Sequence, residues 1–126
     1  MGFVHAEIEL SNPKDASLKP VRVTALVDTG AMTLCIPEHI AVQLKLDEIE
    51  KREVTTADDR SHIVPYVGPL QIRFQGRTCF TGALVIGASV LMGAVPMEDM
   101  DLVISPSGES ITVNPKSPNI PSALVK

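Results

Sequence analysis

Alternation of hydrophobic and polar residues predicts that most of this chain forms short β-strands. In residues 3–10, valine, alanine, isoleucine and leucine occupy one face while histidine and glutamate occupy the other, which is the period of a half-buried strand. Residues 21–27 are rich in β-branched side chains and predict a second strand. The same patterns predict strands at residues 32–36, 51–56, 62–67, 69–74, 77–86, 102–104 and 110–113.

Two segments carry helical signals instead. Pro37 stands where a first helical turn accepts proline, Glu38 follows it, and apolar residues then recur at helical spacing as far as Leu46. Residues 96–100 predict one or two further helical turns. Loops or tight turns are expected at residues 11–15, 57–61, 75–76 and 106–108.

The prolines near the C-terminus predict an end to the regular structure. Pro115, Pro118 and Pro121 make the last segment a poor helix and a poor central strand. We therefore expect one domain over residues 1–113 and a proline-rich tail over residues 114–126 that wraps the surface or reaches a neighbour.

Length and composition support a single mostly-β domain. The chain has 126 residues, which suits one hydrophobic core, and 44% of them are hydrophobic, which excludes a disordered chain. Aromatic residues make up only 3%, so aliphatic side chains must build the core. The expected fold class is all-β, that is, mainly β with two short helices.

Charge and residue usage exclude several function classes. The net charge is −4 and the basic residues are scattered, so no nucleic-acid partner is expected. No apolar run approaches the ~18 residues of a membrane span, and the first residues lack the signal-peptide pattern, so we expect a cytoplasmic protein without membrane contact. Cys35 and Cys79 then predict small buried residues, and the dispersed His5, His39 and His62 predict neither a metal site nor a cofactor.

One carboxylate stands out because it lies inside an apolar stretch. Asp28-Thr29-Gly30-Ala31 follows Leu26-Val27 and precedes further apolar residues. A buried lone aspartate is costly unless it is hydrogen-bonded, paired or protonated. Asp28 therefore either caps N–H groups in an exposed tight turn or needs a partner from elsewhere in the sequence.

A second apolar segment ends in glycine, Val90-Leu91-Met92-Gly93, and a short helix is expected after it. Together with the Asp28 loop, this segment resembles the retropepsin-like aspartic proteases over roughly residues 21–104. The runs that begin at Ile36 and Gly93 look most like small bacterial single-domain members of that family. The resemblance implies a retropepsin-like single-lobe closed β-barrel-like domain with a hairpin flap near residues 54–66.

The resemblance also implies the chemistry. Peptide hydrolysis by carboxylates needs one ionised group and one protonated group around a water, and close carboxyls share a proton, for which such dyads are a known example. The chain has a single Asp-Thr-Gly. The implied enzyme is thus a homodimeric aspartic endopeptidase with the catalytic loop Asp28, Thr29 and Gly30 from each chain. Thr29 would brace the loop across the dimer, and Gly30 would aim its N–H at the carboxylate.

The family pattern implies substrate contacts at Ala31, Ala57, Asp58, Ile63 and Met92, with a protein or peptide bound in extended form. Methionine in an apolar run is also typical of a core, so Met92 has two interpretations.

Three features differ from the retroviral pattern. Met32 and Ala94 stand where those enzymes pair an aspartate with an arginine, and the expected flap contains no glycine. The flap tip, Asp58-Asp59-Arg60, is charged instead. An alternative function therefore stays open: a non-catalytic peptide-binding or scaffold dimer that keeps the fold and uses its cleft for an extended peptide.

Overall fold

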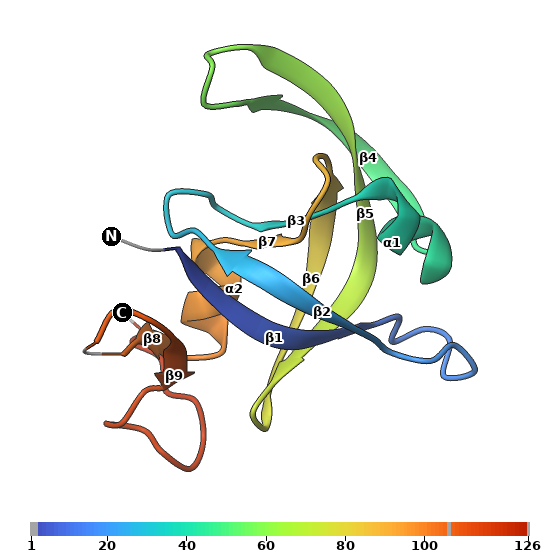
Figure 1. Ribbon diagram of the computed structural model, residues 1–126. Helices are drawn as coiled ribbons and strands as arrows, with labels where there is room; N and C mark the ends of the chain where they lie inside the picture. The colour runs from blue at the N-terminus through green and yellow to red at the C-terminus, as the bar shows by residue number, and fades with distance from the viewer. Residues whose placement is uncertain (1–2, 106, 126) are drawn as a thin grey trace.

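The computed structural model describes residues 3–105 and 107–125 and is dominated by β-strands (Figure 1). Its two helices are short, α1 Glu38–Gln43 and α2 Ala94–Asp99. The strands are β1 Val4–Ser11, β2 Val21–Val27, β3 Leu34–Ile36, β4 Asp47–Thr55, β5 Ser61–Phe74, β6 Arg77–Val85, β7 Leu91–Met92, β8 Leu102–Ile104 and β9 Ile111–Val113. Within the described residues, neither helix is long and apolar enough to cross a membrane.

Strand pairing closes the main sheet into a barrel. The hydrogen-bonded order is β1-β2-β7-β3-β6-β5-β4, and β1 also pairs with β5. That additional pairing closes the six strands from β1 to β5 in this order, and β4 remains outside on the edge of β5. The prediction of a mostly-β, closed-barrel domain with two short helices is confirmed.

The barrel interior is aliphatic, as the low aromatic content requires. Alternate residues of β1 point inward, and Ile8 and Leu10 are fully buried. They pack with inward residues of β3 and β5, among them Leu34, Ile36 and Ile72. Burying one such side chain contributes roughly 1.5–3 kcal/mol, so the period-two pattern decides which face of each strand turns inward.

The β4–β5 hairpin is longer and more continuous than the sequence predicts. Two strands were expected on either side of Gly68, but β5 runs unbroken through Pro65 and Pro69. The register shifts between Glu48 and Glu50 of β4, and between Val67 and Leu70 of β5 in its pairing with β6. The second shift takes up Gly68 and Pro69, and since proline cannot donate to the ladder, the strand continues through an irregularity where the sequence predicts a break.

Helix α1 is shorter than the segment ending at Leu46 that the spacing predicts. Lys45 adopts a positive φ of 51° immediately after the helix. Its N–H donates to the carbonyl of Val42 at 3.0 Å, and the N–H of Leu46 donates to that of Ala41 at 3.0 Å. These two bonds form a Schellman motif, which ends the helix although lysine occupies the position that usually holds glycine.

The C-terminal segment folds back onto its own chain. Arg77, whose side chain is buried, donates to the carbonyl of Met100 at 2.9 Å and to that of Ser117. Asp101 accepts hydrogen bonds from the Asn114 amide at 3.0 Å, the Ser117 hydroxyl and the Ser122 N–H at 2.9 Å. The tail residues up to position 122 are thus attached to the end of α2 by two charged side chains.

Turn 106–108 was expected before β9. Gly108, at φ 74°, donates its N–H to the carbonyl of Ser105 at 2.8 Å, which closes a turn there. Pro106 lies outside the described residues.

Candidate active site

The Asp28 loop is positioned by a short strand from much later in the chain. Strand β7 lies between β2 and β3, parallel to the former and antiparallel to the latter. The N–H of Asp28 donates to the carbonyl of Met92 at 3.0 Å, and that of Leu26 donates to the carbonyl of Val90 at 2.9 Å. The end of β2 is therefore held in place up to the aspartate itself.

The second apolar–glycine segment completes the loop. The N–H groups of Gly93, Ala94 and Val95 donate to three successive loop carbonyls at 3.0, 2.9 and 2.8 Å, those of Thr33, Ala31 and Met32 respectively. A Cβ on Gly93 would lie 2.6 Å from the Thr33 oxygen and 2.7 Å from the Ala31 oxygen. Only glycine allows this approach, so the two motifs form one structural unit.

The Asp28 carboxylate lies on the surface of the single chain, although its flanking residues are apolar. Asp28, Thr29 and Gly30 are all exposed. The N–H of Gly30 donates to Oδ1 of Asp28 at 2.9 Å, as predicted, and a Cβ at Gly30 would lie 3.1 Å from the same oxygen. The carboxylate is thus fixed in direction, and a partner can approach it from outside the chain.

The two cysteines are free thiols that the fold keeps protonated. Burial, followed by the charge of Asp28, raises the pKa of Cys35. Burial and a hydrogen bond to Asp99 raise the pKa of Cys79 to about 12. Since the thiolate is the nucleophilic form, neither cysteine is a reactive nucleophile near neutral pH.

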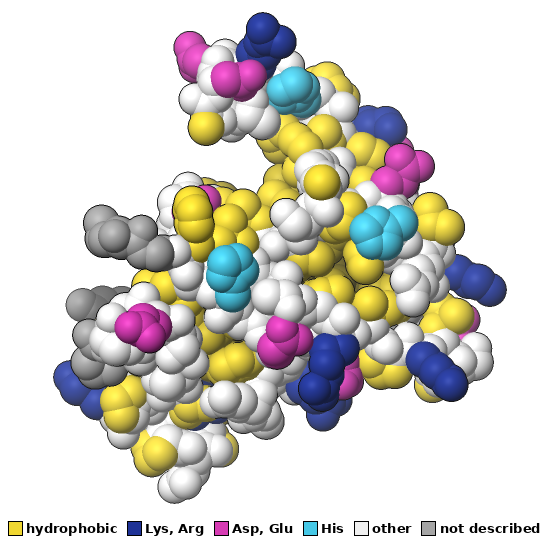
Figure 2. Space-filling view, viewed as in Figure 1, with side chains coloured by type: hydrophobic (Ala, Val, Ile, Leu, Met, Phe, Trp, Pro, Cys, Tyr) yellow, Lys and Arg dark blue, Asp and Glu magenta, His cyan; other side chains and the backbone are white. Residues whose placement is uncertain are grey.

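The hairpin tip predicted as a flap borders a groove. Figure 2 shows a hollow beneath the projecting β4–β5 hairpin, with hydrophobic side chains along its inner side. The open groove at the hairpin measures ≈ 630 Å³ and is lined by Thr56, Ala57, Asp58, His62, Ile63, Val64 and Ile86. Its lining combines apolar side chains with a polar tip, a composition suited to a peptide side chain.

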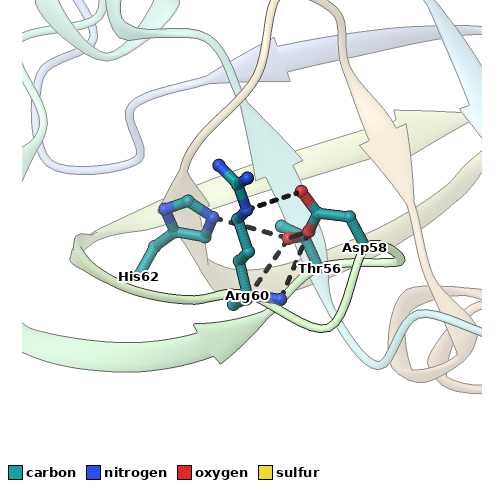
Figure 3. A network of polar contacts seen from close by, with 4 residues as sticks. All are labelled: Thr56, Asp58, Arg60 and His62. Atoms are coloured by element: carbon teal, nitrogen blue, oxygen red, sulfur yellow. Dashed lines mark hydrogen bonds and ion pairs between the residues drawn. The ribbon is translucent and has the colours of Figure 1, made fainter.

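Side chains lock the tip into a closed turn (Figure 3). The Thr56 hydroxyl donates to Asp58, and the Arg60 N–H donates to the same carboxylate at 3.3 Å, which together lower the pKa of Asp58. Nε of Arg60 lies 3.7 Å from Asp58, and Nε2 of His62 lies 3.4 Å from the Thr56 hydroxyl. These contacts give the tip an order that glycines would not.

The structure places the predicted substrate contacts in three environments. Ala57, Asp58 and Ile63 are exposed and line the groove, while Ala31 is half-buried in the Asp28 loop. Met92 is fully buried, so it belongs to the core and its assignment as a substrate contact is wrong for the side chain. Its backbone carbonyl instead holds Asp28.

Sequence reasoning missed several groove residues. The register of the hairpin places Val54 opposite His62 and Thr55 opposite Ser61. Thr56 and His62 therefore lie at the two ends of the tip, and this position becomes clear once the strand pairing is known. Ile86 follows another strand, and only the tertiary fold brings it to the groove.

Comparison with protein families gives a match over most of the chain. A family model described as aspartyl protease matches residues 15–114. No curated protein matches.

Solved structures give the same fold at low identity. The EIAV protease, complexed with an inhibitor, is 21% identical with a TM-score of 0.52, covering 78% of this chain and 88% of that one. The retroviral protease-like domain of Ddi1 from Leishmania major is 14% identical with a TM-score of 0.55, covering 89% and 90% respectively. The retropepsin-like fold that the two motifs predict is confirmed.

Proposed function

Since the chain belongs to the aspartyl protease family, we propose that it is a homodimeric aspartic endopeptidase whose site contains two Asp28 carboxyls, one from each chain. One observation carries the proposal: the single Asp-Thr-Gly of the chain presents an exposed carboxylate, that of Asp28, on a loop fixed by backbone hydrogen bonds. A rigid, exposed carboxylate with open space before it is what a two-fold dyad requires.

Apolar surface around the loop supports a second copy as the partner. Met32 is 76% exposed and Val95 46%, and these residues are joined by a backbone hydrogen bond beside the loop. Phe3, 80% exposed, precedes Val4, which pairs with the last residue of β2. Exposed apolar residues gathered around a polar centre are typical of an interaction surface.

The proposed reaction needs no cofactor. One Asp28, ionised, takes a proton from a water, and the oxygen of that water attacks the peptide carbonyl carbon. The other Asp28, protonated, gives its proton to the carbonyl oxygen, so the pair holds one proton before and after this step. In the collapse of the tetrahedral intermediate, a protonated Asp28 gives its proton to the leaving nitrogen, the C–N bond breaks, and one hydroxyl of the intermediate returns its proton to the ionised Asp28, so the pair again holds one proton.

The proposed substrate is a protein or peptide in extended form. The groove at the flap receives one of its side chains, with Ile63 covering the apolar part. Main-chain hydrogen bonds between an extended peptide and a hairpin would add affinity without restricting sequence.

Replacement of the carboxylate tests the catalytic role. Asp28→Asn should abolish cleavage of a peptide library and leave the circular dichroism spectrum and the sedimentation coefficient unchanged. Asp47→Asn is the matched control, because Asp47 is an exposed carboxylate that pairs only with Lys14, at 3.6 Å, among the described residues. Cleavage by Asp28→Asn at the wild-type rate would refute the assignment. Wild-type protein that binds extended peptides without cleaving them would favour the scaffold alternative.

Mixing the same variant with wild-type protein tests the dimer. If one site contains two chains, activity after subunit exchange should fall with the square of the wild-type fraction, because only wild-type homodimers carry two carboxyls. A linear dependence on that fraction, or an active monomer in sedimentation, would contradict the homodimer.

A further inference from the structure

At the root of the flap, two side chains stack on the backbone of a third strand. The Tyr66 ring lies against the backbone of Gly82 on the neighbouring strand β6. A Cβ added at Gly82 would lie 2.2 Å from Cζ of Tyr66 and 2.4 Å from its hydroxyl oxygen. The ring thus occupies space that any other residue at position 82 would fill.

Arg52 covers the same ring. Cζ of Arg52 lies 3.6 Å from the ring centroid, within the range of a cation–π contact. Nε of Arg52 donates to Oε2 of Glu50 at 2.8 Å, which orients the guanidinium plane. Gly82 on β6, Tyr66 on β5 and Arg52 on β4 therefore form one layered contact, called here the root stack.

The root stack lies where the hairpin leaves the barrel. Among the described residues, β4 pairs only with β5, so its backbone is tied to the barrel through that one strand. Arg52 is the cross-strand partner of Val64, which lines the groove, while Tyr66 pairs with Leu84 of β6. The stack therefore connects the groove wall to the barrel strand beneath it.

We propose that Tyr66, held between Gly82 and Arg52, is a positioning residue that fixes the flap over the cleft, so that substrate meets a preformed groove. This inference rests on the proposed peptidase function. According to this inference, the root stack, rather than the tip of the flap, sets the affinity for the peptide. The stack acts through the flap and does not touch the reacting atoms.

The expected effect follows from the strength of the contact. Loss of an exposed cation–π contact should change the ratio of positioned to displaced flap by about two- to five-fold. The apparent affinity for substrate falls with the population of the competent state. KM should therefore rise, by up to about five-fold, while kcat stays within about two-fold of wild type because the carboxyl pair is unchanged.

The decisive comparison is between Arg52→Ala and Lys51→Ala. Both substitutions remove one exposed cation from strand β4, so the changes in net charge and in strand propensity are closely matched. Lys51 pairs with Glu48 at 2.9 Å and lies opposite Pro65, away from the ring. Tyr66→Phe keeps the ring and should behave as wild type, whereas Gly82→Ala forces the ring out of its place.

Tyr66 itself reports on the stack without any activity. It is the only tyrosine in a chain without tryptophan, so intrinsic fluorescence above the phenylalanine range comes from this ring. Arg52→Ala should increase acrylamide quenching of that fluorescence and weaken the near-UV circular dichroism of the tyrosine. Hydrogen exchange at residues 56–60 should become faster in Arg52→Ala and Gly82→Ala and stay unchanged in Lys51→Ala and Tyr66→Phe.

The outcomes separate this inference from the peptidase proposal. Faster exchange at the tip together with a raised KM, both specific to the stack variants, supports the inference. Equal exchange in Arg52→Ala and Lys51→Ala, or a KM that does not separate them in an active enzyme, overturns it and leaves the peptidase standing. If the wild-type protein cleaves no peptide, the peptidase proposal fails, and hydrogen exchange alone then decides whether the stack positions the flap.

Discussion

Gly93 offers the sharpest test of how the two motifs are joined, because its replacement by alanine perturbs only the space between them. Gly93 has φ −90° and ψ −167°, an extended conformation that alanine adopts without strain. The added Cβ, however, would lie 2.6 Å from the Thr33 oxygen and 2.7 Å from that of Ala31. Both atoms are backbone, so the Asp28 loop must move away from β7.

The magnitude follows from what that movement disrupts. Overpacking by one methyl group costs about 1–3 kcal/mol, and each weakened backbone hydrogen bond adds about 1 kcal/mol. Three such bonds join the residues from Gly93 to Val95 to the loop. We expect Gly93→Ala to lower the free energy of unfolding by about 2–5 kcal/mol, a large part of the ~5–15 kcal/mol typical of a domain. A loop displaced by about 1 Å should also reduce peptide cleavage by about 100-fold.

Urea unfolding at one fixed protein concentration, combined with a peptide-cleavage assay, measures both effects. Gly76→Ala is the control, because a Cβ there meets nothing within 4 Å and its φ of 81° costs only about 1–2 kcal/mol. If the Gly93→Ala protein has the same free energy of unfolding as this control and cleaves peptide at the wild-type rate, the prediction is wrong. The Asp28 loop and β7 are then not held tightly together.

Two further predictions concern proton-linked behaviour. The Ser117 hydroxyl, followed by the Asn114 amide and the Ser122 N–H, lowers the pKa of Asp101 from 3.8 to about 2. A carboxyl whose pKa is lower in the folded state stabilises the protein above its unfolded pKa, and this stabilisation is lost as pH falls from about 4 to about 2. Asp101→Asn should therefore lower Tm at neutral pH, and the Tm values of variant and wild type should converge near pH 2. A difference in Tm that stays constant with pH would contradict this. In the proposed dimer, Ala31→Ser should move both limbs of the pH–rate profile to lower pH, because a hydroxyl beside the two carboxyls would stabilise the ionised form. Superimposable profiles would mean that Ala31 is not beside the dyad or that the dyad does not exist.

Most of the barrel could be predicted because its signals are local. Strand β1 shows apolar residues at every second position, and β2 is rich in β-branched residues. Both signals depend only on neighbouring positions, and burial of the apolar face in the core then fixes the strands. The Asp28 loop was recognisable through its resemblance to a family motif, which depended on the apolar flanks of the loop, the expected flap hairpin and the second apolar–glycine segment as well as on the consecutive Asp-Thr-Gly. The hydrogen bond from the Gly30 N–H to the Asp28 carboxylate joins residues only two positions apart, so it is a local contact of this loop.

Predictions failed where a residue's usual preference gave way to its surroundings. Lys45 ends α1 in a conformation usually left to glycine, because two backbone hydrogen bonds and the buried Leu44 before it favour the cap. The break expected between residues 67 and 69 does not occur, because the register shift between Val67 and Leu70 in the pairing with β6 absorbs Pro69. Met92 could not be assigned to core or cleft until the position of β7 between two strands was known.

The sequence by itself determined the strand pattern, the aliphatic core and the single Asp-Thr-Gly that predicts a dyad shared by two chains. Only the tertiary structure decided which distant segments touch: Gly93 against the Asp28 loop, Tyr66 between Gly82 and Arg52, and the tail against Asp101. The reason is physical. Alternation and turn chemistry act over a few residues, whereas these contacts depend on the closure of the barrel, which brings together backbone that is far apart along the chain.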